Sequence, residues 1–252
     1  MFHVKQVMSK SYTNTLGHPI GFPLPEWTPR SLPPRTTIPG RYCHIELLNP
    51  EKQGDALHAA DMMDPDGANW TYLFQDLPTD RSAYQEYLQT IAASNDPLFH
   101  AIVDARTGEA VGMAALMRID VKNGAIEVGN IRYSPRLQRT PAATEAMFLL
   151  MKRVFDELGY RRYEWKCDSL NAPSKSAARR LGFVYEGEFR QAVVYKQRNR
   201  DTSWFAMIDS EWPALKAAYE AWLSPDNFTP DGQQKQRLAD LIAAEKSKLG
   251  PS

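Results

Sequence analysis

The sequence has few cysteines, no surplus of charge of either sign and no long apolar run. Its two cysteines, Cys43 and Cys167, are too few for a disulfide framework and have no spacing that suits zinc. Lys and Arg number 30, as do Asp and Glu, so the basic surplus typical of nucleic-acid-binding proteins is missing. No stretch approaches the roughly 18 apolar residues of a membrane span, and residues 1–17 contain no apolar signal core. These absences predict a cytoplasmic protein with neither nucleic acid nor membrane as a partner.

Several catalytic signatures are also missing from the sequence. The five histidines are scattered without H-x-x-H or H-E-x-x-H spacing, so no metal is expected as a cofactor. There is no G-x-S-x-G elbow, no G-x-x-x-x-G-K-[ST] loop and no G-x-G-x-x-G fingerprint. Their absence argues against a serine hydrolase, a nucleoside triphosphatase and a dehydrogenase.

Proline is concentrated near the N-terminus, where seven of the 18 prolines fall between Pro19 and Pro39. Proline fixes φ and lacks an amide donor, which excludes a helix or a central strand. Residues 1–40 are therefore expected to form an extended arm laid on the fold, with Phe22, Leu24 and Trp27 as anchors. A proline-rich ligand for another protein is the alternative.

From residue 41 the pattern becomes an ordered alternation of strands and helices, which predicts an α/β domain over residues 41–210. Turn residues at 106–108 and 123–124 join three closely spaced strands, as in an antiparallel meander. A helical extension is predicted over residues 211–252. The predicted strands are 42–48, 98–104, 109–119, 125–133, 162–167, 183–195 and 202–209, and the predicted helices are 51–63, 80–93 with Thr79 as N-cap, 141–158, 173–181, 212–223 and 233–248.

The junction between the strand ending at Tyr133 and the helix starting at Pro141 carries the main chemical signal. A loop that leads directly from a strand into a helix leaves first-turn amides unpaired, and these amides and the helix dipole can bind an anion such as a pyrophosphate. Small residues there let a phosphate approach the backbone. An ordinary strand-to-helix loop with proline at the first helical position is the alternative.

A second motif follows about 30 residues later, Asn171-x-x-Ser174, a short helix and Leu-Gly-Phe ending at Phe183. In this order the two motifs resemble the GCN5-related N-acetyltransferase (GNAT) superfamily, and in particular its ribosomal-protein N-terminal acetyltransferase (RimJ/RimL-like) branch. The resemblance covers residues 41–209 and implies a mostly antiparallel mixed sheet with a splayed strand pair and flanking helices. It also implies acetyl coenzyme A as co-substrate, bound by Ile131, Tyr133, Gln138, Arg139, Thr140, Ala142, Ala143, Thr144, Asn171 and Ser174.

Two positions depart from the family pattern. Pro141 replaces the first glycine of the pyrophosphate loop, which removes one amide donor at a position where a helix tolerates the loss. Ala178 occupies the place where many members have a tyrosine acid, so the resemblance points to Ser174 as the proton donor. Glu127 is the first choice of general base, in a strand with Gly129 as the expected bulge; a structural ion pair, for example with Arg132, is the alternative.

The predicted reaction is acetyl transfer from acetyl-CoA to a primary amine by direct attack in a ternary complex. The acceptor, either a protein N-terminus or a small amine, is expected to contact Tyr72 and Arg190 outside the coenzyme site. The basic run 196–201 suggests an acidic acceptor, although it also suits a solvated hairpin tip. A non-catalytic acyl-CoA-binding protein remains the alternative, and monomer and homodimer both stay open.

Overall fold

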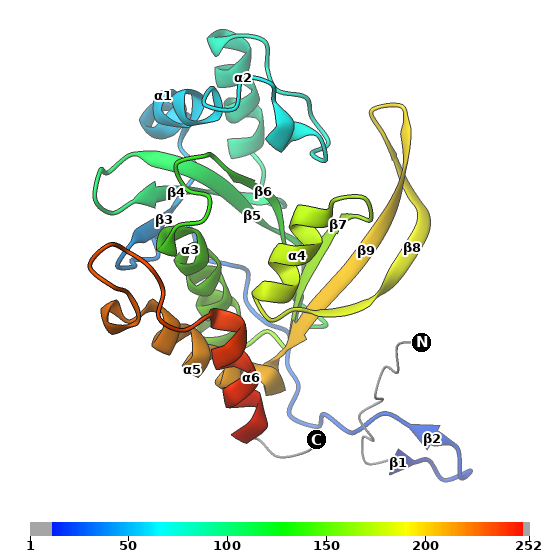
Figure 1. Cartoon of the computed structure of the whole chain (residues 1–252). Coiled ribbons are helices and arrows are strands. Elements are labelled where there is room, and N and C mark those ends of the chain that lie inside the picture. Colours follow the sequence, from blue (N-terminus) through cyan, green and yellow to red (C-terminus); the bar gives the residue numbers. More distant parts are fainter. Residues whose placement is uncertain (1–11, 249–252) are drawn as a thin grey trace.

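The computed structural model describes residues 12–248, which build one seven-stranded sheet and its flanking helices (Figure 1). The strands lie in the order β3-β4-β5-β6-β7-β9-β8, and every neighbouring pair is antiparallel except β6 and β7. The strands are β3 (Cys43–Leu47), β4 (Leu98–Asp104), β5 (Ala110–Asp120), β6 (Ala125–Tyr133), β7 (Arg162–Asp168), β8 (Val184–Tyr195) and β9 (Arg198–Ile208). The mostly antiparallel mixed sheet confirms the predicted fold class.

Helices cover both faces of the sheet. Helices α1 (Pro50–Asp61) and α2 (Arg81–Ala92) pack on one face, where Leu57, Tyr84 and Leu88 form a core with β4 and β5. The opposite face carries the larger core and the remaining helices (Figure 1). These are α3 (Pro141–Lys152) with a π-helical turn at Arg153–Glu157, α4 (Ala172–Arg180), α5 (Trp212–Leu223) and α6 (Leu238–Lys248).

Most predicted elements are present within one or two residues, but β9 begins at Arg198 rather than at residue 202, and two further local predictions were wrong. Asp80, not Thr79, caps α2, because its carboxylate accepts a hydrogen bond from the Ala83 amide at 2.9 Å. Helix α6 begins at Leu238 rather than at residue 233, because Asn227 bonds to the Gln236 amide and carbonyl and thereby holds residues 233–237 in a loop.

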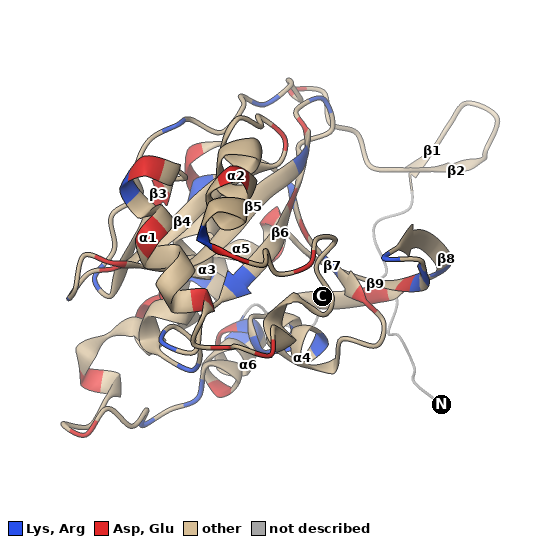
Figure 2. Ribbon diagram, turned by 90° about the horizontal axis from the view of Figure 1, so that it is seen from above, with Lys and Arg blue, Asp and Glu red and all other residues tan. Residues whose placement is uncertain are grey.

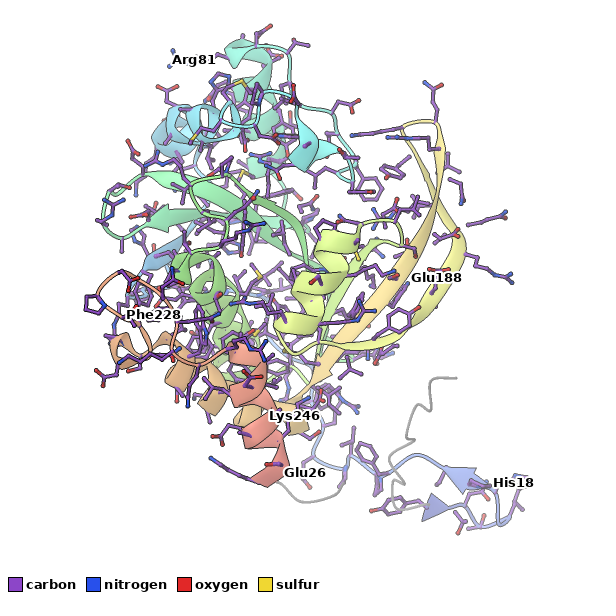
Figure 3. The ribbon with its side chains drawn as sticks, in the orientation of Figure 1. His18, Glu26, Arg81, Glu188, Phe228 and Lys246 are labelled. Carbon is purple, nitrogen blue, oxygen red and sulfur yellow. The ribbon has the colours of Figure 1, made fainter. Side chains whose placement is uncertain are left out.

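The proline-rich arm is anchored at one of the three predicted side chains. Trp27 donates its indole N–H to the Lys122 carbonyl and lies against Gly124, where an added Cβ would be 2.4 Å from the ring. Phe22 and Leu24 are exposed and are not buried anchors, although the Phe22 ring lies 5.8 Å from the guanidinium carbon of Arg161. Before them, β1 (Tyr12–Thr13) and β2 (Pro19–Ile20) form a hairpin that stands away from the sheet, with His18 labelled in Figure 3. Residues 1–11 of the predicted arm lie outside the described residues.

Charges of both signs are interspersed along the helices and strands (Figure 2). No helix within residues 12–248 is long and apolar enough to cross a membrane. In the same part of the chain, no group of three or more His, Cys, Asp and Glu side chains is arranged to hold a metal ion.

Candidate active site

The central strands β6 and β7 separate partway along their length. Residues Ala125–Val128 of β6 pair in parallel with residues Arg162–Trp165 of β7. Both strands continue for several residues beyond this point without pairing with each other. Beyond that point two residues of β6, Asn130 and Ile131, lie opposite one residue of β5, and the φ of Asn130 is 49°. This bulge lies one residue beyond the predicted position Gly129, and it turns the free edge of β6 away from β7. The opening exposes unpaired backbone groups to a ligand.

A pocket of 680 Å³, called here the larger pocket, lies on one side of this opening. Its walls come from the end of β6, the loop into α3, the first turns of α3 and α4, and the loop after α5. Among residues 12–248, the two charged residues that line it are Arg139 and Arg180, and no carboxylate of this part of the chain does. Two guanidinium groups and two helix N-termini make this an environment for a ligand that carries several negative charges.

The loop into α3 shows how the chain tolerates Pro141. The Thr140 hydroxyl caps α3 by accepting from the Ala143 amide at 3.2 Å, so the proline occupies the first helical position without an unmet donor. The preceding residue, Arg139, has a φ of 61°, and its backbone amide donates to no acceptor within the described residues. That amide and the Ala142 amide, which has no intrahelical partner, remain for an anion.

Nine of the ten residues predicted to hold the coenzyme line the larger pocket. Ala142 does not: its side chain is 7% exposed and belongs to the core, and its carbonyl accepts from the Cys43 thiol. Its contribution to an anion site is therefore restricted to its backbone amide. The last turn of α5 adds Trp222 and the loop after it adds Phe228, both of which the sequence analysis missed; Phe228 is labelled in Figure 3.

A second pocket of 250 Å³, the smaller pocket, lies on the other side of the opening. Glu127 lines it and is almost fully buried, with Lys166 at 2.8 Å and Arg118 at 3.3 Å from its carboxylate. Burial raises the pKa of Glu127 above its ordinary value near 4.5, although both cations oppose that shift. Glu127 thus forms the ion pair named as the alternative, but with Lys166 and Arg118; the example partner Arg132 was wrong, since it pairs with Asp61 at 2.9 Å.

Four residues line both pockets and therefore mark the point where the pockets meet: Ile131, Trp165, Asn171 and Ser174. The Ser174 hydroxyl accepts from the Trp165 indole at 2.9 Å, which leaves its own proton available to donate. Asn171 caps α4 through its side chain, which accepts from the Ser174 amide at 3.0 Å. The Asn-x-x-Ser spacing thus places the hydroxyl at the start of α4, where the helix dipole favours negative charge.

The two predicted acceptor contacts have different positions. Tyr72 lines the smaller pocket, and its hydroxyl donates to the Leu170 carbonyl at 3.2 Å. Arg190 does not line it; the side chain is exposed beside Asp201 on the β8–β9 hairpin. The sequence analysis named Arg200 only as part of the basic run 196–201; its side chain is 8% exposed and lines the smaller pocket. The burial of Arg200 could have been predicted from the two-residue alternation of a strand, which places Arg200 on the same face of β9 as Thr202 and Trp204.

Comparison with known proteins gives the class of this protein. A family model described as an acetyltransferase (GNAT) domain matches residues 45–184. This match and the splayed sheet define an acyltransferase. Because the match takes in more than half of the chain, the chain belongs to the GCN5-related N-acetyltransferase (GNAT) family.

Solved structures agree with this assignment. A GCN5-related N-acetyltransferase from Brucella melitensis is 51% identical, with a TM-score of 0.86 over 87% of this chain and 100% of that chain. A GNAT-family acetyltransferase from Chromobacterium violaceum is 39% identical, with a TM-score of 0.72 over 78% of this chain and 98% of that chain. An acetyltransferase from Salmonella typhimurium that modifies the N-terminal serine of ribosomal protein L7/L12 shares the fold at 20% identity. Its TM-score is 0.59 over 69% of this chain and 99% of that chain. No curated protein matched the sequence significantly.

Proposed function

We propose that this protein transfers an acetyl group from acetyl-CoA to a primary amine, with both substrates bound at once. The observation that carries the proposal is the pair of pockets that meet at Ser174 across the opening between β6 and β7. The larger pocket has the charge for a pyrophosphate, and the smaller pocket contains a buried carboxylate for an amine. Acetyl-CoA supplies the activated acetyl thioester.

Each residue at the opening has a defined task in this proposal. The free edge of β6 from Ile131 to Tyr133 binds an extended pantetheine arm, and the Arg139 and Ala142 amides bind its pyrophosphate. Glu127 accepts a proton from the ammonium group of the acceptor, and the amine nitrogen then forms the amide bond to the acetyl carbon. As the carbon–sulfur bond breaks, Ser174 donates its proton to the departing sulfur and recovers a proton, through water, from the acetylated nitrogen, which thereby becomes a neutral amide. Glu127 releases its proton to solvent.

The acceptor is a protein N-terminus or a small amine. The fold shared with the Salmonella typhimurium enzyme supports a place near the ribosomal-protein branch, but at 20% identity it does not choose the acceptor. Tyr72 lies on the acceptor side of Ser174 and forms part of the pocket wall. The exposed position of Arg190 supports no direct contact with a molecule in the smaller pocket.

Calorimetric titration with acetyl-CoA, followed by a thiol-release assay over a panel of amines and N-terminal peptides, tests the proposal. Binding of acetyl-CoA with turnover on at least one amine is expected. Binding without turnover on any acceptor would support the non-catalytic alternative. If acetyl-CoA does not bind, both the proposed acetyl transfer and the non-catalytic acyl-CoA-binding alternative are overturned.

An aspartate in place of Ala143 is expected to weaken acetyl-CoA binding more than tenfold, a penalty above about 1.4 kcal/mol. Ala143 lines the larger pocket, so the new carboxylate would repel the phosphates. The variant is expected to fold, because an acidic residue in the first turn suits a helix N-terminus. Titration of the variant measures the effect, with Ala105→Asp as a control that adds the same charge at an exposed loop residue. Equal affinity in both variants would refute the pyrophosphate assignment.

Replacement of Ser174 by alanine is expected to lower kcat by about 10- to 100-fold, with little change in acetyl-CoA affinity. Asn171 supplies the cap of α4, so loss of the Ser174 hydroxyl removes a proton donor without removing the cap. Ser176→Ala, at an exposed position of the same helix, is the matched control. A lower unfolding temperature with intact kcat would instead show that Ser174 acts only through its bond to Trp165.

A further inference from the structure

One face of β9 presents unpaired hydrogen-bonding groups to the smaller pocket. Arg200, Thr202 and Trp204 alternate along the strand, and all three line the pocket. The Arg200 Nε, the Thr202 hydroxyl and the Trp204 indole nitrogen are each buried and have no hydrogen-bond partner within the described residues. Buried polar groups are normally paired, so three orphans on one pocket wall point to a ligand that pairs them.

Arg200 is the most informative member of this row. Its side chain is buried between two aromatic rings, with its guanidinium carbon 5.1 Å from the centroid of Phe74 and 5.7 Å from that of Tyr195. Within residues 12–248 it forms neither an ion pair nor a hydrogen bond. Burial of a charge lowers the stability of the folded protein by roughly several kcal/mol unless a counter-charge compensates it. The aromatic rings provide no counter-charge, and the buried carboxylate of Asp168 in the same pocket bonds to the Tyr195 hydroxyl and forms no ion pair with Arg200, so a direct partner for the guanidinium is expected from the ligand.

The surroundings of Arg200 indicate which kind of anionic group the ligand carries. A guanidinium presents two parallel N–H groups that match a planar carboxylate. Asp168 of β7 lies opposite Thr202 of β9 in the sheet. Both Asp168 and Glu127 line the smaller pocket, so negative charge is already present near Arg200. A singly charged carboxylate adds less repulsion there than a doubly charged phosphate.

We infer that Arg200 binds a carboxylate of the acceptor, so that the enzyme acts on amines whose molecule also carries a carboxylate. The inference rests on the proposed function, because it assigns the acceptor to the smaller pocket. The Thr202 hydroxyl and the Trp204 indole N–H supply further donors along the same wall. The carboxylate could belong to an acidic peptide or to a small amino acid, and both offer the same group to Arg200.

Matched acceptors separate these sources. Glycylglutamate and glycylglutamine, both amidated at the C-terminus, are compared with each other, and 4-aminobutyrate is compared with butylamine, so that one member of each pair carries a single carboxylate and the other carries none. The wild-type enzyme is expected to prefer the carboxylate member of at least one pair by tenfold or more in kcat/KM. Preference in the first pair alone identifies a peptide acceptor, and preference in the second identifies a small one. Turnover of the panel without any such preference overturns the inference and leaves the proposed function intact.

Variants test the residue itself. Arg200→Met is expected to raise the KM of the preferred acceptor at least tenfold while the KM of acetyl-CoA stays unchanged. Arg198→Met, which removes the same charge from an exposed position two residues away on β9, is expected to leave both values unchanged. Equal acceptor KM values in the two variants would overturn the assignment.

A measurement without turnover keeps the inference testable even if the enzyme acetylates none of these amines. Glutarate, a carboxylate without an amine, is expected to raise the unfolding temperature of the wild-type protein and of Arg198→Met, but not of Arg200→Met. Without glutarate, Arg200→Met is expected to unfold at a higher temperature than the wild type, since it removes an uncompensated buried charge. A lower unfolding temperature together with an unchanged response to glutarate would show that Arg200 is only a structural cation.

Discussion

Replacement of Glu127 by glutamine is expected to lower kcat by about 10²- to 10⁴-fold, the range typical of a lost general base. Glutamine keeps the size of the side chain but cannot accept the proton of the acceptor ammonium. Glu127 is the buried carboxylate of the smaller pocket, and its raised pKa brings it closer to neutral pH, where a base is most effective. The KM of acetyl-CoA is expected to stay unchanged, since the coenzyme site proposed above is the larger pocket.

The pH profile separates this role from a structural one. A base works in its ionised form, so kcat of the wild type falls as the pH falls through the pKa of Glu127. Because burial raises that pKa, the decline lies above the pH at which an ordinary glutamate titrates near 4.5. In Glu127→Gln this decline should vanish.

Glu164→Gln is the matched control for the Glu127 variant. The Glu164 carboxylate lies 2.6 Å from the same Lys166 ammonium, but Glu164 does not line the pocket. Its replacement therefore disturbs Lys166 without removing a group from the acceptor side. Similar kcat values and pH profiles for the two variants would show that Glu127 only holds Lys166 in place.

The fold was largely predictable because local chemistry determines its elements. Turn residues at 106–108 and 123–124 enforce an antiparallel β4-β5-β6 meander, and the apolar stripe after Pro141 forms α3 as predicted. The same stripe concealed the end of that helix, where the chain forms a π-helical turn at Arg153–Glu157. Hydrophobic periodicity identifies a buried face but does not distinguish a regular from a widened turn.

The candidate site was less predictable because it depends on long-range packing. The two sequence motifs identify the loops around the larger pocket, but the direction of a side chain at a helix start depends on what packs behind it. Ala142 therefore faces the core while Ala143 faces the pocket. The bulge at Asn130 likewise depends on the register between β5 and β6, which strand propensity alone does not determine.

Distant parts of the chain complete both pockets, which local patterns could not reveal. Trp222 at the end of α5 and Phe228 in the loop after it reach the larger pocket, although they follow the second motif by about 40 residues or more. Arg200 belongs to a basic run that resembles a solvated hairpin tip, yet it pairs with Val193 of β8, two residues from the point where Thr202 pairs with Asp168 of β7, and it lines the smaller pocket. Burial of a charged residue follows from topology rather than from composition.

The Asp61–Arg132 pair is expected to be the most sensitive site for stability. Its side chains are 6% and 2% exposed, with 2.9 Å between carboxylate and guanidinium. Arg132 also donates to the Tyr84 hydroxyl at 2.7 Å and stacks over the Trp70 ring at 4.3 Å. The pair thus joins α1 and α2 to β6, the strand that carries the opening.

Asp61→Asn is expected to lower the free energy of unfolding by about 3–5 kcal/mol, because it leaves the buried guanidinium of Arg132 without a counter-charge. Urea-induced unfolding, followed by tryptophan fluorescence, measures the loss. Asp55→Asn breaks the exposed pair between Asp55 and Arg81 and is expected to cost less than about 1 kcal/mol. The double variant Asp61→Leu/Arg132→Met should recover most of the loss, since no unpaired charge remains. If Asp61→Asn and Asp55→Asn lower the free energy of unfolding equally, burial of the Asp61–Arg132 pair does not determine how much that pair contributes to stability.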